Sequence, residues 1–152
     1  DSGTLIAVGI GRANMMMGMV LVVDDEPDLV TTLERLLQGL GHTCLQAHTG
    51  PDAIARIDRE GPDLVVTDLR LPGTGGLAVA RHARRHIPPI PVILITGYDS
   101  AQARTAARES GVDAYLSKPF SNAAFLDAVQ RVLDPGLSGG AADGPPVERA
   151  RP

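Results

Sequence analysis

Residues 20–29 read VLVVDDEPDL and join four aliphatic residues directly to three consecutive acids. The run at residues 20–23 has no polar member, which predicts a short strand buried on both faces. Asp24, Asp25 and Glu26 follow at once, although neighbouring carboxylates repel one another and are costly to remove from water. The stretch therefore predicts a central strand whose end carries acids, at a place where something offsets their charge.

Length and composition are those of one globular domain with additional terminal residues. The chain has 152 residues, of which 43% are hydrophobic and 21% charged. Its formal net charge of −4 gives no reason to expect direct binding to nucleic acid or to an anionic membrane. The single cysteine, Cys44, excludes an internal disulfide and a thiolate zinc cluster. No apolar run reaches the roughly 20 residues that span a bilayer, so we expect a cytoplasmic protein.

The chain divides into three parts. Residues 19–133 carry the regular apolar pattern and form the expected domain. Residues 1–18 are an N-terminal extension, because the four methionines lie between Met15 and Met19; it either precedes the natural start or forms a short ordered arm. Residues 134–152 hold four prolines and four glycines, a composition typical of a flexible tail or linker.

Within the domain, short apolar runs alternate with helical patterns. The expected strands cover residues 20–23, 43–47, 64–67, 92–95 and 114–116. The first expected helix covers residues 29–40, the second begins near Thr49 and the third runs from Gly76 to Ile87. The fourth covers residues 100–110 and turns Ala101, Ala103, Ala106 and Ala107 toward the core, and the fifth begins at Ser121. Five such units with wholly apolar strands predict an α/β fold: an open, doubly wound, five-stranded parallel sheet with helices on both faces.

Polar side chains follow four of the five expected strands. Asp24 and Asp25 follow the first, Asp68 the third, Thr96 the fourth and Lys118 the fifth. The carboxyl ends of parallel strands meet at one edge of the sheet, which is where open α/β sheets bind ligands. We therefore expect three carboxylates, a hydroxyl and an ammonium group to converge there.

These groups suit a metal ion and a phosphoryl group. One lysine cannot neutralise three acids, and oxygen ligands without histidine or cysteine indicate Mg²⁺ or a similar ion. A hydroxyl at Thr96 and an ammonium at Lys118 match phosphoryl oxygens. Asp68 is the better candidate for a nucleophile that forms an aspartyl phosphate, while Asp24 and Asp25 are candidate metal ligands.

Each of these residues also has an ordinary structural interpretation. Asp25 or Glu26 could cap the helix that begins near Pro27, Thr96 could serve the turn before its glycine, and Lys118 could be a solvated loop charge. Four strands delivering complementary groups to one edge favours the functional interpretation over these separate ones.

Four stretches together resemble the receiver domain of bacterial two-component response regulators: VLVVDDEPD (20–28), LVVTDLRLPGTGGL (64–77), VILITG (92–97) and AYLSKPF (114–120). The resemblance covers residues 19–133, in order and with the spacing of the family. It implies a flavodoxin-like fold with strand order 2-1-3-4-5 and phosphorylation by a partner histidine kinase.

The resemblance also implies a role for each residue at the expected edge. Asp68 matches the phosphoacceptor, Asp25 the direct metal ligand and Asp24 the acid that binds the metal through water. The remaining matches are the backbone carbonyl of Arg70 for Mg²⁺, Thr96 and Tyr115 for the switch hydroxyl and aromatic, Lys118 for the phosphate-binding lysine, and Arg70, Gly97, Tyr98 and Pro119 as flanking positions. In the family the bond between Lys118 and Pro119 is usually cis.

Two positions depart from the common family pattern or extend it. Gly75 stands where the family often has an acid, so the helix that follows should be less well capped. Arg70 and Tyr98 lie two residues beyond Asp68 and Thr96, and we expect their bulky side chains to shield an acyl phosphate and slow its hydrolysis.

The function implied is that of a signalling switch, which catalyses its own phosphoryl transfer and slow autodephosphorylation but is not an enzyme acting on separate substrates. Its partners would be a sensor histidine kinase or phosphotransfer protein and a downstream protein target or output domain, with a possible homodimer through residues 99–133. A phosphatase of the haloacid dehalogenase type also forms an aspartyl phosphate, but it normally has a second acid where this chain has Arg70. A binding module that keeps the fold without phosphorylation would not need the intact acids.

Overall fold

The computed structural model describes residues 17–134 as five strands alternating with five helices. The strands are β2 (Met19–Val23), β3 (Thr43–Ala47), β4 (Leu64–Asp68), β5 (Val92–Thr96) and β6 (Ala114–Ser117). The helices are α2 (Pro27–Gly39), α3 (Gly50–Glu60), α4 (Gly76–Arg85), α5 (Ala101–Glu109) and α6 (Asn122–Leu133). The expected N-terminal extension and C-terminal tail lie outside the described residues, except for residues 17, 18 and 134.

All five strands form one parallel sheet in the order β3-β2-β4-β5-β6. Counted along the chain this is 2-1-3-4-5, so the predicted fold class is confirmed. The strand that contains residues 20–23 is second in the sheet and has a neighbour on each side. Its continuous aliphatic character follows from this position, because both of its faces are covered by helices.

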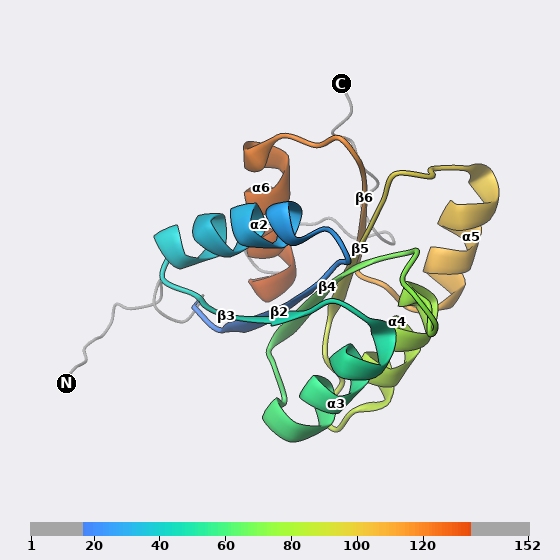
Figure 1. The fold of residues 1–152 in the computed structure, drawn as a ribbon, viewed down its shortest axis with the longest axis horizontal. Coiled ribbons are helices and arrows are strands. Elements are labelled where there is room, and N and C mark those ends of the chain that lie inside the picture. Colours follow the sequence, from blue (N-terminus) through green and yellow to red (C-terminus); the bar gives the residue numbers. More distant parts are fainter. Residues whose placement is uncertain (1–16, 135–152) are drawn as a thin grey trace.

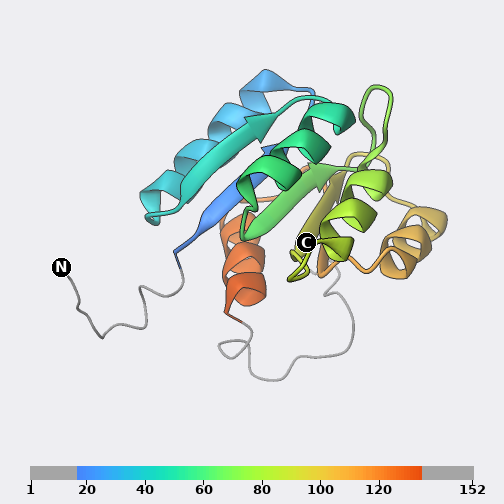
Figure 2. The same ribbon diagram turned by 90° about the horizontal axis from the view of Figure 1, so that it is seen from below.

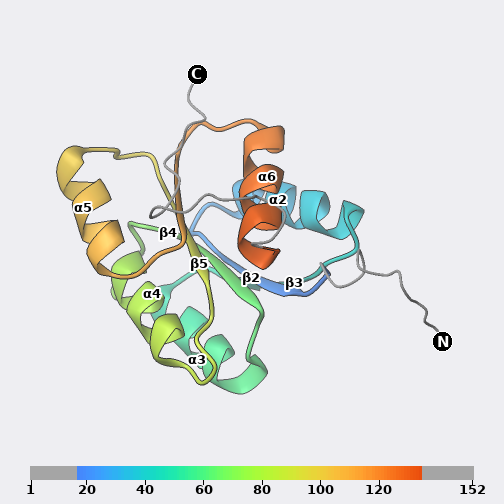
Figure 3. The ribbon, with the colours of Figure 1, turned by 180° about the vertical axis from the view of Figure 1, so that it is seen from behind.

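Helices cover both faces of the sheet. Figure 1 shows α2 and α6 on one side of the strands and α3 and α4 on the other, and Figure 2, seen from below, brings α3 and α4 to the front. Figure 3 shows from behind that α5 lies next to α4 at the edge of the molecule. None of the helices within residues 17–134 is long and apolar enough to cross a bilayer.

Alternate residues of each strand belong to separate hydrophobic cores. Val20 and Val22 pack with Leu33 of α2 and with α6, whereas Leu21 and Val23 pack with α3 and α4. Each fully buried aliphatic side chain of this kind stabilises the fold by about 1.5–3 kcal/mol. The two cores fix the sheet from both sides and hold the carboxyl ends of its strands at one edge.

Three helix starts carry the side-chain caps that stabilise them. Thr49 accepts a hydrogen bond from the Asp52 amide at 3.2 Å, and Ser100 and Ser121 accept equivalent bonds at the starts of α5 and α6. Helix α4 begins after Gly75 without a side-chain cap, as expected from the departure at that position.

Two expectations about the helices are wrong. Helix α4 ends at Arg85, and Ile87 lies outside it with 91% of its surface exposed. The two prolines that follow Ile87 cannot continue a helix, and the residue before a proline is driven out of the helical region. In α5, Ala101 is exposed and Ala107 is the one residue of the helix that is fully buried, so this helix contributes little to the core.

Candidate functional site

The carboxyl ends of four strands bring the predicted residues together at one edge of the sheet. Asp24 follows β2, Asp68 is the last residue of β4 and Thr96 is the last residue of β5. Lys118 follows β6, and its backbone amide donates to the carbonyl oxygen of Thr96 at 2.7 Å. The convergence expected from the strand-end residues is therefore present.

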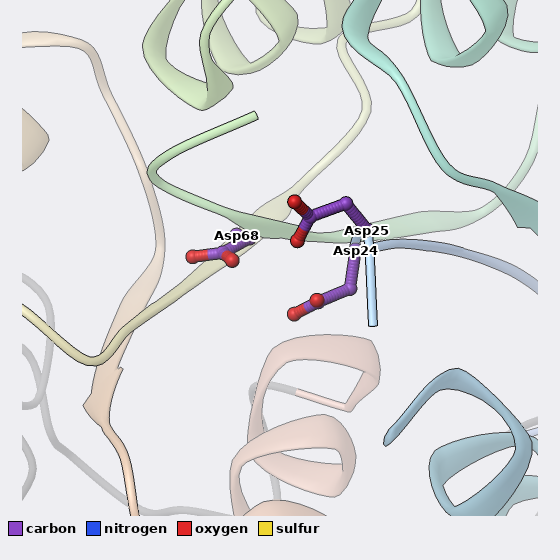
Figure 4. Close-up of side chains that lie close together, drawn as sticks. All are labelled: Asp24, Asp25 and Asp68. Carbon is purple, nitrogen blue, oxygen red and sulfur yellow. The ribbon is translucent and has the colours of Figure 1, made fainter. Parts of the chain in front are cut away.

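Three carboxylates form the centre of the site. One oxygen from each of Asp24, Asp25 and Asp68 lies within 4.8 Å of the others, and Figure 4 shows the three side chains together where β2 and β4 end. Carboxylate oxygens at this spacing are hard donors, which Mg²⁺ prefers. Asp25 is exposed whereas Asp24 and Asp68 are buried, so a cation held here would keep one side open to water. The residues present therefore fit a magnesium ion.

Asp24 is fully buried, and each of its carboxylate oxygens accepts a hydrogen bond. Its Oδ1 accepts the Glu26 amide at 2.9 Å and its Oδ2 accepts the Lys118 ammonium at 3.0 Å. Its backbone carbonyl lies 3.0 Å from Nδ1 of His48. These contacts hold the carboxylate rigidly and offset the cost of its desolvation.

Lys118 is the central cation of the site. Its Nζ lies 3.0 Å from Asp24 Oδ2, 3.3 Å from Asp68 Oδ2 and 3.4 Å from Glu26 Oε1. Burial alone would lower the pKa of this ammonium, but the carboxylates of Asp24 and Asp68 outweigh burial and raise it. Lys118 is therefore a charged group held against the candidate phosphoacceptor, and the interpretation of it as a solvated loop charge is wrong.

The carboxyl group of Asp68 is harder to ionise than an ordinary aspartate. Burial raises its pKa, and the neighbouring Asp24 charge raises it further, while Lys118 and the Arg70 amide act in the opposite direction. The Arg70 N–H reaches Asp68 Oδ1 at 3.4 Å. A positive charge added between the two aspartates would therefore favour the ionised form of Asp68, which is the nucleophilic one.

The Thr96 hydroxyl is buried and bonded to the loop that follows β5. Its Oγ1 accepts the backbone N–H of Tyr98 at 2.9 Å, which closes a tight turn over Gly97. As the acceptor in that bond, the hydroxyl keeps its proton available for another acceptor.

Arg70 and Tyr98 stack on each other beside the site. The guanidinium carbon of Arg70 lies 4.0 Å from the centre of the Tyr98 ring, which is a cation–π contact. Tyr98 remains 61% exposed, so the pair lies at the surface of the protein and not in its interior. The two flanking side chains singled out in the sequence thus contact each other.

Tyr115 lies inside the molecule in this structure. It is only 2% exposed, and its hydroxyl donates to Asp99 Oδ1 at 3.0 Å. The family resemblance predicted Tyr115 as the switch aromatic but did not reveal the acceptor of its hydroxyl. The bond between Lys118 and Pro119 is cis, as expected, and a second cis bond precedes Pro88.

Sequence reasoning left Glu26 without a role. It occupies the position before α2 but makes no side-chain capping bond, so its interpretation as a cap is wrong. Instead its carboxylate faces Lys118. The signal was present in the run of three acids, but Lys118 is 92 residues away and no local pattern joins the two.

Comparison with known proteins assigns the family. Residues 20–130 match the model of the response regulator receiver domain. The chain belongs to this family, the receiver domains of two-component signalling systems, whose members act as switches controlled by an aspartyl phosphate.

Individual relatives agree with the family assignment. The chain is 34% identical over 119 residues to the DNA-binding transcriptional regulator NtrC of Salmonella typhimurium, covering 78% of this chain and 25% of that protein. It is similar to a CheY-like receiver domain from Methanospirillum hungatei, with a TM-score of 0.75, 27% identity and coverage of 82% of this chain and 99% of that one. It also matches the BeF3-activated DrrB receiver domain, with a TM-score of 0.72, 30% identity and coverage of 78% and 98%. The chain spans about a quarter of the length of the NtrC proteins that it matches.

Proposed function

We propose that this chain accepts a phosphoryl group on Asp68 from a phosphohistidine and thereby changes the surface that it offers to another protein. The donor is a sensor histidine kinase or a phosphotransfer protein. The observation that carries the proposal is the position of the Asp68 carboxylate, 3.3 Å from the Lys118 ammonium and beside two further aspartates.

The chemistry is an in-line displacement at phosphorus. A carboxylate oxygen of Asp68 forms the new bond to phosphorus while the bond from phosphorus to the imidazole nitrogen breaks. The electron pair of that bond stays on nitrogen: a ring protonated at its other nitrogen leaves as neutral imidazole, and an unprotonated ring takes up a proton from water as it leaves. Phosphorylation leaves a charge of about −2 where the carboxylate had −1. The chain must supply positive charge to the phosphoryl oxygens as this happens.

Lys118 and Thr96 supply that charge and a hydrogen bond. Lys118 already lies within reach of Asp68, and its Nζ can move from the carboxylates to a phosphoryl oxygen. The Thr96 hydroxyl can donate its proton to a second oxygen, and the Tyr98 amide that is bonded to Thr96 Oγ1 would move with it. Movement of the loop after β5 would follow from that second step.

Asp24, Asp25, Asp68 and the backbone carbonyl of Arg70 would hold Mg²⁺, which when bound supplies positive charge against the phosphoryl oxygens. The spacing of the three carboxylates supports this assignment. Asp24 and Asp25 then act as holders of the cation, and Asp68 alone forms the covalent bond.

The output is a protein contact. A second copy of this chain, contacted through residues 99–133, or a separate target protein would make that contact. An output domain beyond this chain is the other arrangement, and it is the one suggested by relatives that are longer and carry names of DNA-binding regulators.

The test is phosphorylation by a small phosphodonor. The chain is incubated with acetyl phosphate and MgCl₂, and intact-mass spectrometry measures the gain of one phosphoryl group. We expect the gain in the unmodified protein, its loss in Asp68→Asn and its loss when EDTA replaces MgCl₂. Asp127→Asn, which alters an exposed acid of α6 paired with Arg131, is the matched control and should behave as the unmodified protein.

A conformational readout completes this test. Beryllofluoride with Mg²⁺ should shift the amide NMR signals of the loop after β5, and Asp68→Ala should abolish the shift. Phosphorylation of the Asp68→Asn variant to the same extent as the unmodified protein would overturn the assignment of the acceptor.

A further inference from the structure

The loop between β5 and α5 carries a polar cluster that the proposed chemistry does not use. Asp99 lies in this loop, and its two carboxylate oxygens accept three hydrogen bonds. Arg104 donates through Nε to Oδ1 at 2.9 Å and through an NH2 group to Oδ2 at 2.7 Å. The Tyr115 hydroxyl donates to the same Oδ1 at 3.0 Å. We call Asp99, Arg104 and Tyr115 the Asp99 triad.

The triad joins three separate elements. Asp99 belongs to the loop after β5, Arg104 to α5 and Tyr115 to β6. The guanidinium of Arg104 also lies over the Tyr115 ring, 5.9 Å from its centre. One carboxylate thus fixes the loop, the helix and the adjacent strand relative to one another.

Helix α5 has little else to hold it in place. Ala107 is its one fully buried residue, and its other alanines bury little area because their side chains are small. The part of α5 nearest the site is attached through polar contacts, namely the Ser100 cap and the Asp99–Arg104 pair. The triad therefore adds polar contacts to a helix that buries little apolar area.

The hydroxyl of Tyr115 needs an acceptor because of where it lies. Its ring belongs to the hydrophobic core that also contains Ala107 of α5, and the side chain is almost wholly buried. A buried hydroxyl without a partner is costly, whereas one bonded to a charged acceptor is favoured. The pair with Arg104 holds the pKa of Asp99 below its usual range, so the acceptor stays ionised at neutral pH.

We propose that Asp99, oriented by Arg104, is the positioning residue that keeps Tyr115 buried as it is in this structure and that ties the loop after β5 to β6. Without Asp99 the ring still gains from burial, but its hydroxyl loses its partner, and the side chain turns toward water. The consequence for signalling rests on the function proposed above, because Thr96 ends the strand from which this loop starts. The position of Tyr115 itself does not depend on that function.

The experiment follows the two tyrosines in the unphosphorylated protein. The chain has two tyrosines and no tryptophan, so ring-labelled tyrosine gives two sets of NMR signals that Tyr98→Phe assigns. A soluble gadolinium chelate enhances the relaxation of exposed rings. We expect strong enhancement at Tyr98 and weak enhancement at Tyr115. In Asp99→Ala the enhancement at Tyr115 should rise several-fold, while the unmodified reference Tyr98 stays exposed.

Controls separate positioning from general loss of structure. Asp127→Ala removes an ion pair of α6 that touches no tyrosine, and it should leave Tyr115 protected. Arg104→Ala keeps the acceptor but removes the group that orients it, so it should expose Tyr115 partially. If Asp99→Ala unfolds, the exposure of Tyr115 in Arg104→Ala decides whether the triad positions this ring. Circular dichroism checks that the Arg104→Ala variant is folded.

Two outcomes would overturn the inference, and neither bears on phosphorylation. One is a folded Asp99→Ala variant in which Tyr115 is as protected as in the unmodified chain. The other is an Asp127→Ala variant in which the exposure of Tyr115 rises as much as it does in Asp99→Ala. A mass-spectrometric phosphorylation assay on the same samples reports the function of Asp68 separately, so a failure of the triad and a failure of the acceptor assignment can be told apart.

Discussion

Lys118 shows at the scale of one residue how the site is prepared for a change of charge. Its ammonium is shared among Asp24, Asp68 and Glu26 within 3.0–3.4 Å. A cation held by the two aspartates would compete with the lysine for both of them. The Glu26 carboxylate would then remain next to Lys118 while the Nζ of Lys118 turns to a phosphoryl oxygen. Glu26, the third acid of the opening run, therefore lies where it can keep its ion pair with Lys118 after the aspartates bind a cation.

The Arg70–Tyr98 stack gives the first prediction at this scale. If the stack covers the acyl phosphate, breaking it admits water and shortens the lifetime of the phosphorylated state. Because a cation–π contact at an exposed site contributes about 0.5–1 kcal/mol, we expect Arg70→Ala and Tyr98→Ala each to shorten the lifetime by roughly two- to fivefold. The measurement is the loss of the phosphoryl mass after removal of the phosphodonor.

The stack also predicts how the variants combine. Either substitution removes the same contact, so the double variant should decay little faster than each single one. Tyr98→Phe keeps the ring under the guanidinium and should retain most of the lifetime. An unchanged lifetime in the double variant would show that these side chains do not shield the site.

Some residues of the site were predictable from the sequence, and others were not. Asp68, Thr96 and Lys118 could be placed together because each directly follows or ends an apolar strand, and parallel strands end at a common edge. The contacts of Asp99 with Tyr115 and of Glu26 with Lys118 could not, because side-chain partners 16 and 92 residues apart leave no periodic trace.

At the scale of elements, the start of α4 is packed directly against the end of β4. A Cβ at Gly76 would overlap the backbone carbonyl oxygen of Asp68 and lie 2.9 Å from the Leu69 Cα. The Gly76 amide also donates to the Leu69 carbonyl at 2.9 Å. The helix therefore approaches Asp68 more closely than any residue with a side chain would allow.

Gly76→Ala should therefore disturb both stability and the site. The helix or the strand end must move, and overpacking of this kind costs about 1–3 kcal/mol. We expect a lower midpoint in urea unfolding together with weaker binding of beryllofluoride, because the backbone that carries Asp68 shifts. Gly75→Ser is the matched control: a Cβ there lies 3.7 Å from the nearest atom, and the hydroxyl can cap α4.

The opposite result would separate the two effects. A Gly76→Ala protein that unfolds at the same urea concentration as the unmodified chain would show that α4 can move without cost. A less stable Gly75→Ser protein would show that the loop, rather than the contact with β4, limits stability.

The elements themselves were more predictable than their ends and contacts. The five strands differ from expectation by at most one residue at each end, because buried parallel strands are continuous apolar runs. Helix ends depend on single residues such as Pro88, and the exposure of Ala101 depends on how α5 lies against its neighbours. Alanine patterns carry no such information, because alanine is as compatible with water as with a small contact.

At the scale of the whole molecule, the sheet separates two hydrophobic cores, and its amino-terminal end lies opposite the site. His42 lies there, buried just before β3, and its Nδ1 accepts the Gly18 amide at 3.1 Å. This bond joins the start of β3 to the residue before β2. At the amino-terminal end of the sheet, a buried titratable side chain, that of His42, therefore links two strands, at the opposite end of the strands from the acids.

Burial lowers the pKa of His42 below its ordinary value of about 6.5. The unfolded chain therefore binds a proton at this residue before the folded protein does, and stability falls as pH drops from about 6.5 toward the folded pKa. The stability that neutral His42 preserves is fully present above pH 6.5, and one residue can change it by at most about 1.4 kcal/mol per pH unit. We expect urea unfolding of the protein to show this loss between pH 7 and pH 5.

His42→Asn isolates the contribution of this residue from that of the acids. The asparagine oxygen can accept the Gly18 amide in place of Nδ1 but does not titrate, so the difference in unfolding free energy between the two proteins cancels the other groups. That difference should change in favour of the variant as pH falls from 7 to 5 and should be constant from pH 7 to pH 8. A difference that is independent of pH over the whole range would mean that His42 takes up its proton equally in the folded and unfolded protein, and the amino-terminal edge of the sheet would then be open to water.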